Sequence, residues 1–502
     1  MDLSELIGQT DELQTVRQQL TQPGRHLLTG VLGSAKTLIL KSLFQQLKKP
    51  FLVVTDTLSH AQKLTADLTN VLDEEQVRLF PVEELVATEI ATSSPDFQSQ
   101  RVRALTALSQ HKAKVVVTSA SGLRRRLAPV EMWNHNQLTF KVGAELELEQ
   151  VSHQLVQMGY QRQKLVDRPG DFAIRGSIID IYSLNHELPV RIDLFDTEID
   201  SVRFFEIGNQ RSLENVDEIS VMPATDMIQN SQIFTDGIRR LQELEAQVKP
   251  ALKEEQADEL RRQLDAVITM WKDQELLKEH RIFTQILYPQ ATSLLDYLDD
   301  GVLVLDDYAK ILEHADEIEQ NEQVWLDEKE ELKPVLDQLQ LGFEVRKLVR
   351  ETKKSTLFMS LFKKGIGRLK FASLTDLKVR TVQQFFSQMP LLQTEARRWN
   401  KQNQTVVLMI QDEERLTKIS QTLDDFEIPN IMTQPENLQR GILQIVRGSL
   451  QSGFEVPSAK LVVLTETELF AKATKKRAKR LTMENAERLK SYTDRGWPVS
   501  WR

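Results

Sequence analysis

The 502-residue sequence predicts an α/β protein that is interrupted by an inserted module of short strands and followed by a smaller α/β unit. In residues 1–127, helical patterns alternate with short apolar runs, which favours a parallel sheet covered by helices. Between residues 128 and 212, short alternating strands punctuated by Gly, Pro, Asn and Asp replace the helices. At roughly 150 residues per domain, the length allows about three or four domains.

The composition is that of an ordinary globular chain and excludes several kinds of site. Hydrophobic residues make up 40% and charged residues 27%, with a formal net charge of -9. There is no cysteine, which excludes disulfides, zinc fingers, iron–sulfur clusters and thiol catalysis. Because the sequence has neither an apolar run near the ~20 residues of a membrane helix nor a basic-then-apolar leader, we expect a cytoplasmic protein that does not enter a membrane.

Local patterns place the strands and helices of both α/β parts. A helix is expected at 34–49, directly after an apolar run, and the charged residues 237–280 have the spacing of a long helix pair. A further α/β unit is expected to begin near residue 350. The expected buried strands are 26–30, 50–56, 77–81, 113–120 and 302–307 in the first part, and 405–411, 441–448 and 460–467 in the last.

The loop after the first strand nearly matches the phosphate-binding pattern G-x-x-x-x-G-K-[ST]. In such a loop, backbone N–H groups at a helix N-terminus cradle phosphates, the lysine reaches the β- and γ-phosphates, and the hydroxyl holds magnesium. The sixth position is alanine here, and its Cβ should crowd a phosphate. Two interpretations stay open, a loop that has lost the nucleotide and one that still binds it. The candidate residues are Gly30, Gly33, Ser34, Ala35, Lys36 and Thr37.

An acid pair follows the apolar strand that begins at residue 302, as an ATP-driven motor requires. Asp306 could hold magnesium through its water shell. The next residue should be a glutamate that activates water, and Asp307 is one methylene shorter. The alternative is a strand that simply ends in solvated acids. No other catalytic pattern is present, because the eight histidines lack metal-ligand spacing and there is no G-x-S-x-G.

Strand alternation divides residues 190–195 into two faces. Val190, Ile192 and Leu194 share the face that we expect in the core, and Arg191, Asp193 and Phe195 share the other. An exposed phenylalanine beside an arginine is typical of an interface. The alternative is that Phe195 starts a turn and packs beneath it.

One basic block stands out in this acidic chain. It favours either a solvated helix face or linker, or a patch for nucleic acid. Because the whole chain is acidic, we expect weak and salt-sensitive DNA binding. The block consists of Lys472, Lys475, Lys476, Arg477, Lys479 and Arg480.

Residues 169–212, PGDFAIRGSIIDIYSLNHELPVRIDLFDTEIDSVRFFEIGNQRS, resemble the second domain shared by UvrB and the bacterial transcription-repair coupling factor family, Mfd. TGVLGSAKT resembles the first motor motif of UvrB, and SLLDYLDDGVLVLDD resembles its second in degraded form. Residues 79–108 and 468–494 are similar to segments of Mfd. UvrB has a tyrosine-rich hairpin in its first domain, whereas the first tyrosine here is Tyr160, so the resemblance favours Mfd.

The resemblance implies a degenerate RecA-like P-loop domain with an inserted α+β UvrA-binding domain, followed by a small separate α/β domain. The final RGWPVSWR matches nothing in the family, so we expect an N-terminal fragment with a foreign tail. The implied divisions are 1–127 and 213–345 for the P-loop domain, 128–212 for the insert, 346–457 for the small domain, and 458–502 for a linker and the start of the RNA-polymerase-interacting region.

In this family the second domain docks UvrA, and the positions that match the docking residues are Arg175, Arg191 and Phe195. A structural ion pair of Arg175 with Asp180 or Asp193 is the competing interpretation. The implied function is recruitment of UvrA to stalled RNA polymerase in transcription-coupled nucleotide excision repair. ATP and magnesium serve the full-length family, and we expect neither a cofactor nor ATPase activity here.

Two other functions remain as alternatives. The first is a UvrB-type ATP-dependent DNA helicase subunit, which Ala35, Asp307, the absent tyrosine hairpin and the absence of a second motor lobe oppose. The second is a P-loop domain that senses nucleotide without turnover.

Overall fold

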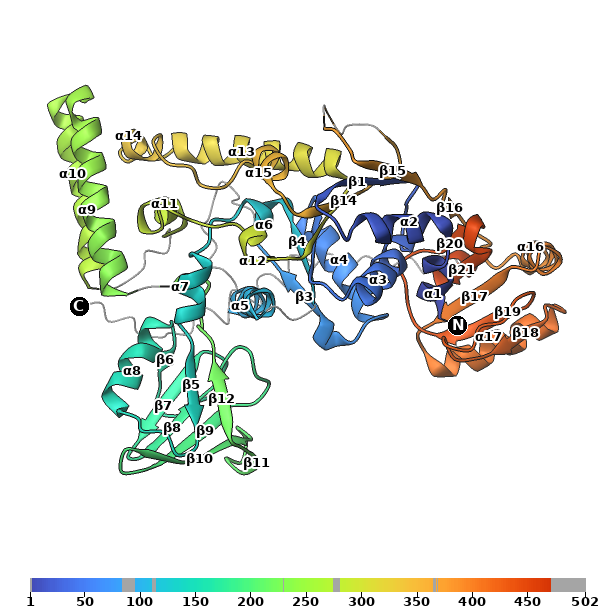
Figure 1. Ribbon diagram of the computed structural model, residues 1–502, viewed down its shortest axis with the longest axis horizontal. Coiled ribbons are helices and arrows are strands. Elements are labelled where there is room, and N and C mark those ends of the chain that lie inside the picture. The colour runs from blue at the N-terminus through green and yellow to red at the C-terminus, as the bar shows by residue number, and fades with distance from the viewer. Residues whose placement is uncertain are drawn as a thin grey trace, which may run out of the picture.

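A seven-stranded parallel sheet lies in the middle of the molecule, with a β-rich domain projecting from it on one side and a second α/β sheet at one end (Figure 1). The computed structural model describes residues 2–83, 95–110, 114–228, 230–273, 280–363, 367 and 369–470. Among these residues, no helix is long and apolar enough to cross a membrane.

The central sheet has the order β15-β1-β14-β13-β2-β4-β3. The inner strands are buried on both faces, which explains why they read as continuous apolar runs in the sequence. The strands expected in this part are confirmed. Their bounds are β1 Gly24–Thr29, β2 Phe51–Thr55, β3 Val77–Phe80, β4 Val115–Ser119, β13 Val302–Asp306, β14 Ser355–Met359 and β15 Ser373–Asp376.

Helices cover both faces of this sheet, as expected for a doubly wound fold. Val53 and Val304 face one core together with the helices α1–α4, whereas Leu52 and Leu305 face the other with α5, α6 and α13. These helices are α1 Leu3–Gly8, α2 Asp11–Gln19, α3 Ala35–Leu47, α4 Leu58–Thr69, α5 Pro95–Ser109, α6 Ala120–Arg124, α13 Tyr308–Asp327 and the nearby α15 Val345–Glu351.

Two strands of the central sheet come from a part of the chain that the sequence assigned to the small domain. β14 pairs with both β1 and β13, and β15 forms the edge beside β1. The implied division at residue 346 therefore does not coincide with the end of this sheet. Parallel pairing joins segments that lie hundreds of residues apart, so local periodicity does not reveal which sheet a strand enters.

The insert is built on a six-stranded sheet in the order β11-β10-β9-β8-β7-β6. A two-stranded sheet of β5 and β12 joins it to the body, so the β-rich module extends past residue 212. The insert's strands are β5 Leu138–Lys141, β6 Gln161–Arg162, β7 Asp171–Arg175, β8 Ile178–Ile181, β9 Val190–Phe195, β10 Glu198–Phe205, β11 Ser212–Val216 and β12 Glu218–Val221, and its helices are α7 Val130–His135 and α8 Leu148–Gln157.

A helix pair stands apart from both sheets (Figure 1). α9 Ser231–Val248 and α10 Glu254–Lys272 confirm the expected pair, and Trp271 fixes its base by packing against Phe234 and Phe283 with ring centroids 6.3 and 5.8 Å away. Short helices complete this part: α11 Thr284–Leu287, α12 Leu294–Tyr297 and α14 Lys333–Leu336.

The small α/β domain has its own six-stranded sheet, in the order β16-β20-β21-β17-β19-β18. One face of β17 packs on the domain's own helices through Leu408, whereas Val407 and Met409 on the other face join the core of the central sheet. The elements are β16 Arg380–Thr381, β17 Thr405–Ile410, β18 Asn430–Met432, β19 Leu443–Arg447, β20 Phe454–Val456, β21 Leu461–Thr465, α16 Met389–Lys401, α17 Glu413–Asp425 and α18 Glu466–Leu469.

A buried ion-pair cluster holds the insert to the central domain. Asp226, on the chain that leaves the insert, is 3% exposed. Its Oδ2 accepts hydrogen bonds from Arg101 Nε at 2.9 Å and lies 2.6 Å from Arg125 Nη2. Nearby, Arg103 Nε donates to the carbonyl of Leu184 in the insert at 2.6 Å. These contacts set the direction in which the insert projects.

We predict that Asp226→Ala lowers the free energy of unfolding by about 3–5 kcal/mol, because it leaves two buried guanidinium groups without this carboxylate. Urea denaturation measures the loss. The matched control is Asp316→Ala, which removes a two-pronged ion pair with Arg346 at the surface and should cost about 1 kcal/mol or less. Equal losses in the two variants would contradict this role of Asp226.

Candidate functional site

The P-loop pattern forms the expected strand–loop–helix. β1 ends at Thr29 and α3 begins at Ala35, with left-handed backbone at Gly30 (φ 72°) and Gly33 (φ 53°). Both angles are unfavourable for residues with a Cβ, so the two glycines fit the turn. Ala35 is fully buried.

Three backbone N–H groups of this loop donate to atoms elsewhere in the protein. Gly30 donates to the carbonyl of Leu361 at 3.2 Å and Val31 to that of Ser360 at 3.3 Å. Ser34 N–H, at the start of α3, donates to the hydroxyl of Ser452 at 3.3 Å. A bound phosphate would need N–H donors of this kind. One of them, the Ser34 N–H, already donates to Ser452.

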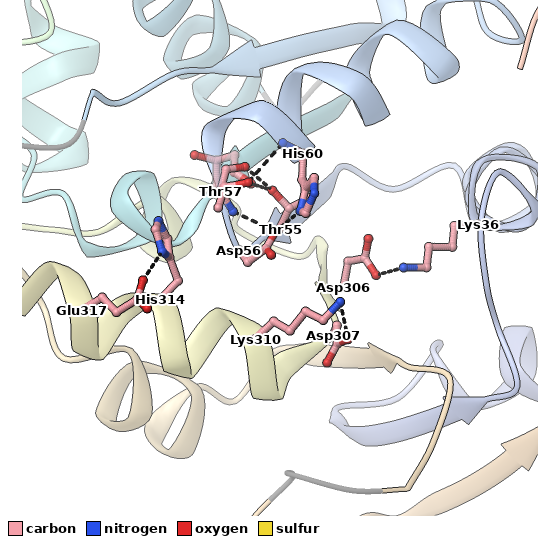
Figure 2. A network of polar contacts seen from close by, with 11 residues as sticks. Lys36, Thr55, Asp56, Thr57, His60, Asp306, Asp307, Lys310, His314 and Glu317 are labelled. Carbon is pink, nitrogen blue, oxygen red and sulfur yellow. Dashed lines mark hydrogen bonds and ion pairs between the residues drawn. The ribbon is translucent and has the colours of Figure 1, made fainter. Parts of the chain in front are cut away.

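The functional side chains of the motif are also engaged, as Figure 2 shows. Lys36 Nζ lies 2.5 Å from Asp306 Oδ1, which places the candidate magnesium ligand in an ion pair. Asp307, in left-handed backbone with φ 61°, lies 3.6 Å from Lys310. Thr37 Oγ1 is buried, and no hydrogen bond to it is found within the described ranges. The charged side chains of these motifs therefore form ion pairs with one another.

A cavity of about 250 Å³ remains beside the loop, and further polar side chains line it. Asp56 and His60 form a close pair with 2.5 Å between Oδ1 and Nδ1 (Figure 2). Burial raises the pKa of Asp67, which accepts a hydrogen bond from Ser34 Oγ at 3.0 Å. Across the residues that the structure describes, no group of three or more His, Asp or Glu side chains is placed to hold a metal ion.

On the insert, β9 has the two faces that its sequence predicts. Val190, Ile192 and Leu194 are buried, whereas Phe195 is 79% exposed. A two-residue turn, with Asp196 at φ 59°, joins Phe195 to its partner Glu198 on β10. The interpretation that Phe195 packs beneath a turn is therefore wrong, because the ring lies in solvent at the end of its strand.

The two candidate arginines meet at one buried carboxylate. Asp180 on β8 is 1% exposed, and its Oδ2 accepts hydrogen bonds from Arg175 Nη2 at 2.5 Å and Arg191 Nη2 at 2.9 Å. Arg191 Nε also donates to Oδ1 at 2.6 Å. The ion pair of Arg175 with Asp180 that the sequence offered as an alternative is thus present.

Arg191 is more enclosed than strand alternation indicates. Its guanidinium lies 4.3 Å above the Phe205 ring centroid and donates to Gln210 Oε1 at 2.8 Å. Its side chain is only 12% exposed, and that of Arg175 is 42% exposed. The hydrogen bond with Asp180 raises the pKa of Arg191. Of the three candidate docking residues, Phe195 and Arg175 are exposed, whereas Arg191 is mostly enclosed.

The sequence did not identify Phe205 and Gln210 as partners of Arg191. The sequence carries only a weak signal for these contacts with Arg191, because Phe205 lies on the neighbouring strand β10 and Gln210 lies in the turn before β11. The basic block at 472–480 lies outside the described residues, so its expected role stays a prediction.

We predict that Arg191→Ala lowers the free energy of unfolding by about 2 kcal/mol or more, because Asp180 stays buried with one partner fewer. Arg175→Ala should cost about 1 kcal/mol or less, since that side chain is partly solvated. Phe195→Ala should change stability by about 0.5 kcal/mol at most. Urea denaturation of the three variants gives the order, and a neutral Arg191→Ala would contradict it.

Comparison with known proteins agrees with this architecture. Residues 138–227 match the family model of the UvrB interaction domain, which includes β5–β12. The chain is 36% identical over 98% of its length to the transcription-repair-coupling factor of Bacillus subtilis (strain 168), and 31% identical to that of Staphylococcus aureus (strain MRSA252). It spans 42% of the length of each relative. Over nearly its whole length the chain is therefore similar to transcription-repair-coupling factors, and residues 138–227 form a UvrB interaction domain.

Proposed function

We propose that this chain docks UvrA through the face of the insert that carries Phe195 and Arg175. The observation that supports it is the 79% exposure of Phe195 within the UvrB interaction domain. A large ring left in water contributes little to the fold, whereas buried against a partner it supplies contact area. Arg175 can add hydrogen bonds to a carboxylate or carbonyl of the partner.

Arg191 acts in this proposal as a positioning residue. Its bonds to Asp180 fix β8 against β9, and the same carboxylate orients Arg175. Loss of Arg191 should therefore weaken docking through a disturbed face. Asp193, which is paired with Arg203, supplies a further charge beside the ring.

Within a coupling factor, we infer that this docking recruits UvrA to stalled RNA polymerase for transcription-coupled nucleotide excision repair. We assign contact with the polymerase and movement along DNA to parts of the relatives that the chain does not span. The net charge of -9 supports only weak contact with duplex DNA. We further propose that this recruitment takes place in the cytoplasm.

We also infer that the degenerate P-loop neither binds nor hydrolyses ATP. The support is that the Ser34 N–H donates to Ser452 and that Lys36 is held by Asp306. Ala35 is buried in a core, so its Cβ does not crowd a phosphate as the sequence led us to expect. The residues present therefore do not fit a nucleoside triphosphate with its magnesium ion.

We predict that Phe195→Ala weakens UvrA binding roughly thirtyfold, which corresponds to about 2 kcal/mol. Arg175→Ala should weaken it by a smaller factor, since part of that side chain already serves Asp180. Isothermal titration of UvrA into each folded variant measures the dissociation constants.

The control for this titration is Phe362→Ala. Phe362 is 65% exposed, but it lies in the segment between β14 and β15 of the central domain. Its loss should leave UvrA affinity unchanged. UvrA binding that survives Phe195→Ala together with Arg175→Ala would exclude this surface.

We predict that the chain shows no DNA-stimulated ATP hydrolysis above a Lys36→Ala variant. A fluorescent ATP analogue should likewise show no saturable binding. Hydrolysis that Lys36→Ala abolishes would instead support the UvrB-type helicase function.

A further inference from the structure

The loop between β19 and β20, residues 448–453, reaches from the small domain to the first turn of α3. Ser34 N–H donates to Ser452 Oγ at 3.3 Å, and Ser452 N–H donates to Ser34 Oγ at 3.2 Å. The two serines lie 418 positions apart in the chain. Their reciprocal hydrogen bonds join the two sheets at the P-loop.

Further polar contacts hold this loop against α4. Gln451 Nε2 donates to the carbonyl of Lys63 at 3.0 Å. Asn70 Nδ2 donates to the carbonyl of Ser449 at 3.1 Å. The loop is therefore fixed at several points along its length.

The two glycines of the P-loop motif make room for protein. A Cβ on Gly33 would lie 2.7 Å from Ser452 Oγ, closer than real contacts allow. A Cβ on Gly30 would lie 2.7 Å from both the Lys378 nitrogen and Asp376 Oδ1. In a nucleotide-binding loop, glycine is usually needed so that a phosphate can approach the backbone. Here glycine is needed at both positions because other parts of the chain pack closely against them.

Apolar side chains also join the 448–453 loop and β20 to the P-loop. Leu450 at the loop, with Phe454 and Val456 on β20, belongs to the same buried core as Val31 and Ala35 of the P-loop. Ala35 thereby packs its methyl group in a core instead of facing a phosphate.

We propose that the P-loop of this chain is a dock for residues 448–453, with Ser452 accepting the hydrogen bond that a phosphate would accept in a nucleotide-binding loop. The dock fixes the small domain against the central sheet. It assigns a role to Gly33 and Ser34 that needs no ligand, whereas Gly30 makes room for Asp376 and Lys378.

Hydrogen–deuterium exchange of the full chain tests the dock. Ser452→Ala should speed amide exchange about tenfold in peptides that cover 31–38 and 448–456, because the bridging acceptor is lost. Exchange in the insert should not change. Ser449→Ala is the matched control, since this serine contacts Asn70 through its backbone carbonyl, and it should alter neither peptide.

A double-mutant cycle on the melting temperature gives an independent readout. Gly33→Ala should lower the melting temperature both through its left-handed backbone and through the clash with Ser452. Ser452→Gly removes that clash, so the double variant should melt higher than additivity predicts. Additive losses, or equal exchange in Ser452→Ala and Ser449→Ala, would overturn the proposal.

Discussion

The presentation of the insert depends on one buried carboxylate, Asp226, held between Arg101 and Arg125. A domain joined to a body by two chain crossings is free to swing unless other contacts restrict it. Here the restraint includes a desolvated, hydrogen-bonded ion-pair cluster, which is directional, beside the apolar core that the insert shares with the central domain. The candidate docking face on β9 therefore has a defined orientation relative to the central sheet before any partner arrives.

The central sheet shows how a nucleotide-binding framework can lose its ligand and keep its shape. A P-loop needs glycines and N–H groups that point outward, and both features suit any acceptor of suitable geometry. A serine hydroxyl is such an acceptor, and it carries no charge that magnesium must balance. Lys36 and Asp306, which would otherwise be left with unbalanced charge, neutralise each other. The same residues thus contact one another instead of a ligand, beside a cavity of about 250 Å³.

Local sequence patterns predicted the elements well but not all of their neighbours. β2, β4 and β13 could be placed because burial on both faces produces apolar runs. The sheet that β14 enters could not, because its partners β1 and β13 are distant in sequence. Likewise, strand alternation correctly predicted that Phe195 is exposed. It could not predict the enclosure of Arg191, because that depends on Phe205 on the neighbouring strand. The contact of Ser452 with Ser34 has no local signature at all.

Two phenylalanines on adjacent strands show why exposure indicates a partner. Phe205 on β10 is fully buried and supports the Arg191 guanidinium, so its place follows from the stability of the insert. Phe195 on β9 lies in solvent and adds almost nothing to that stability. Exposure of a large ring also carries a risk of aggregation. The proposed docking of UvrA would cover this ring and remove that risk.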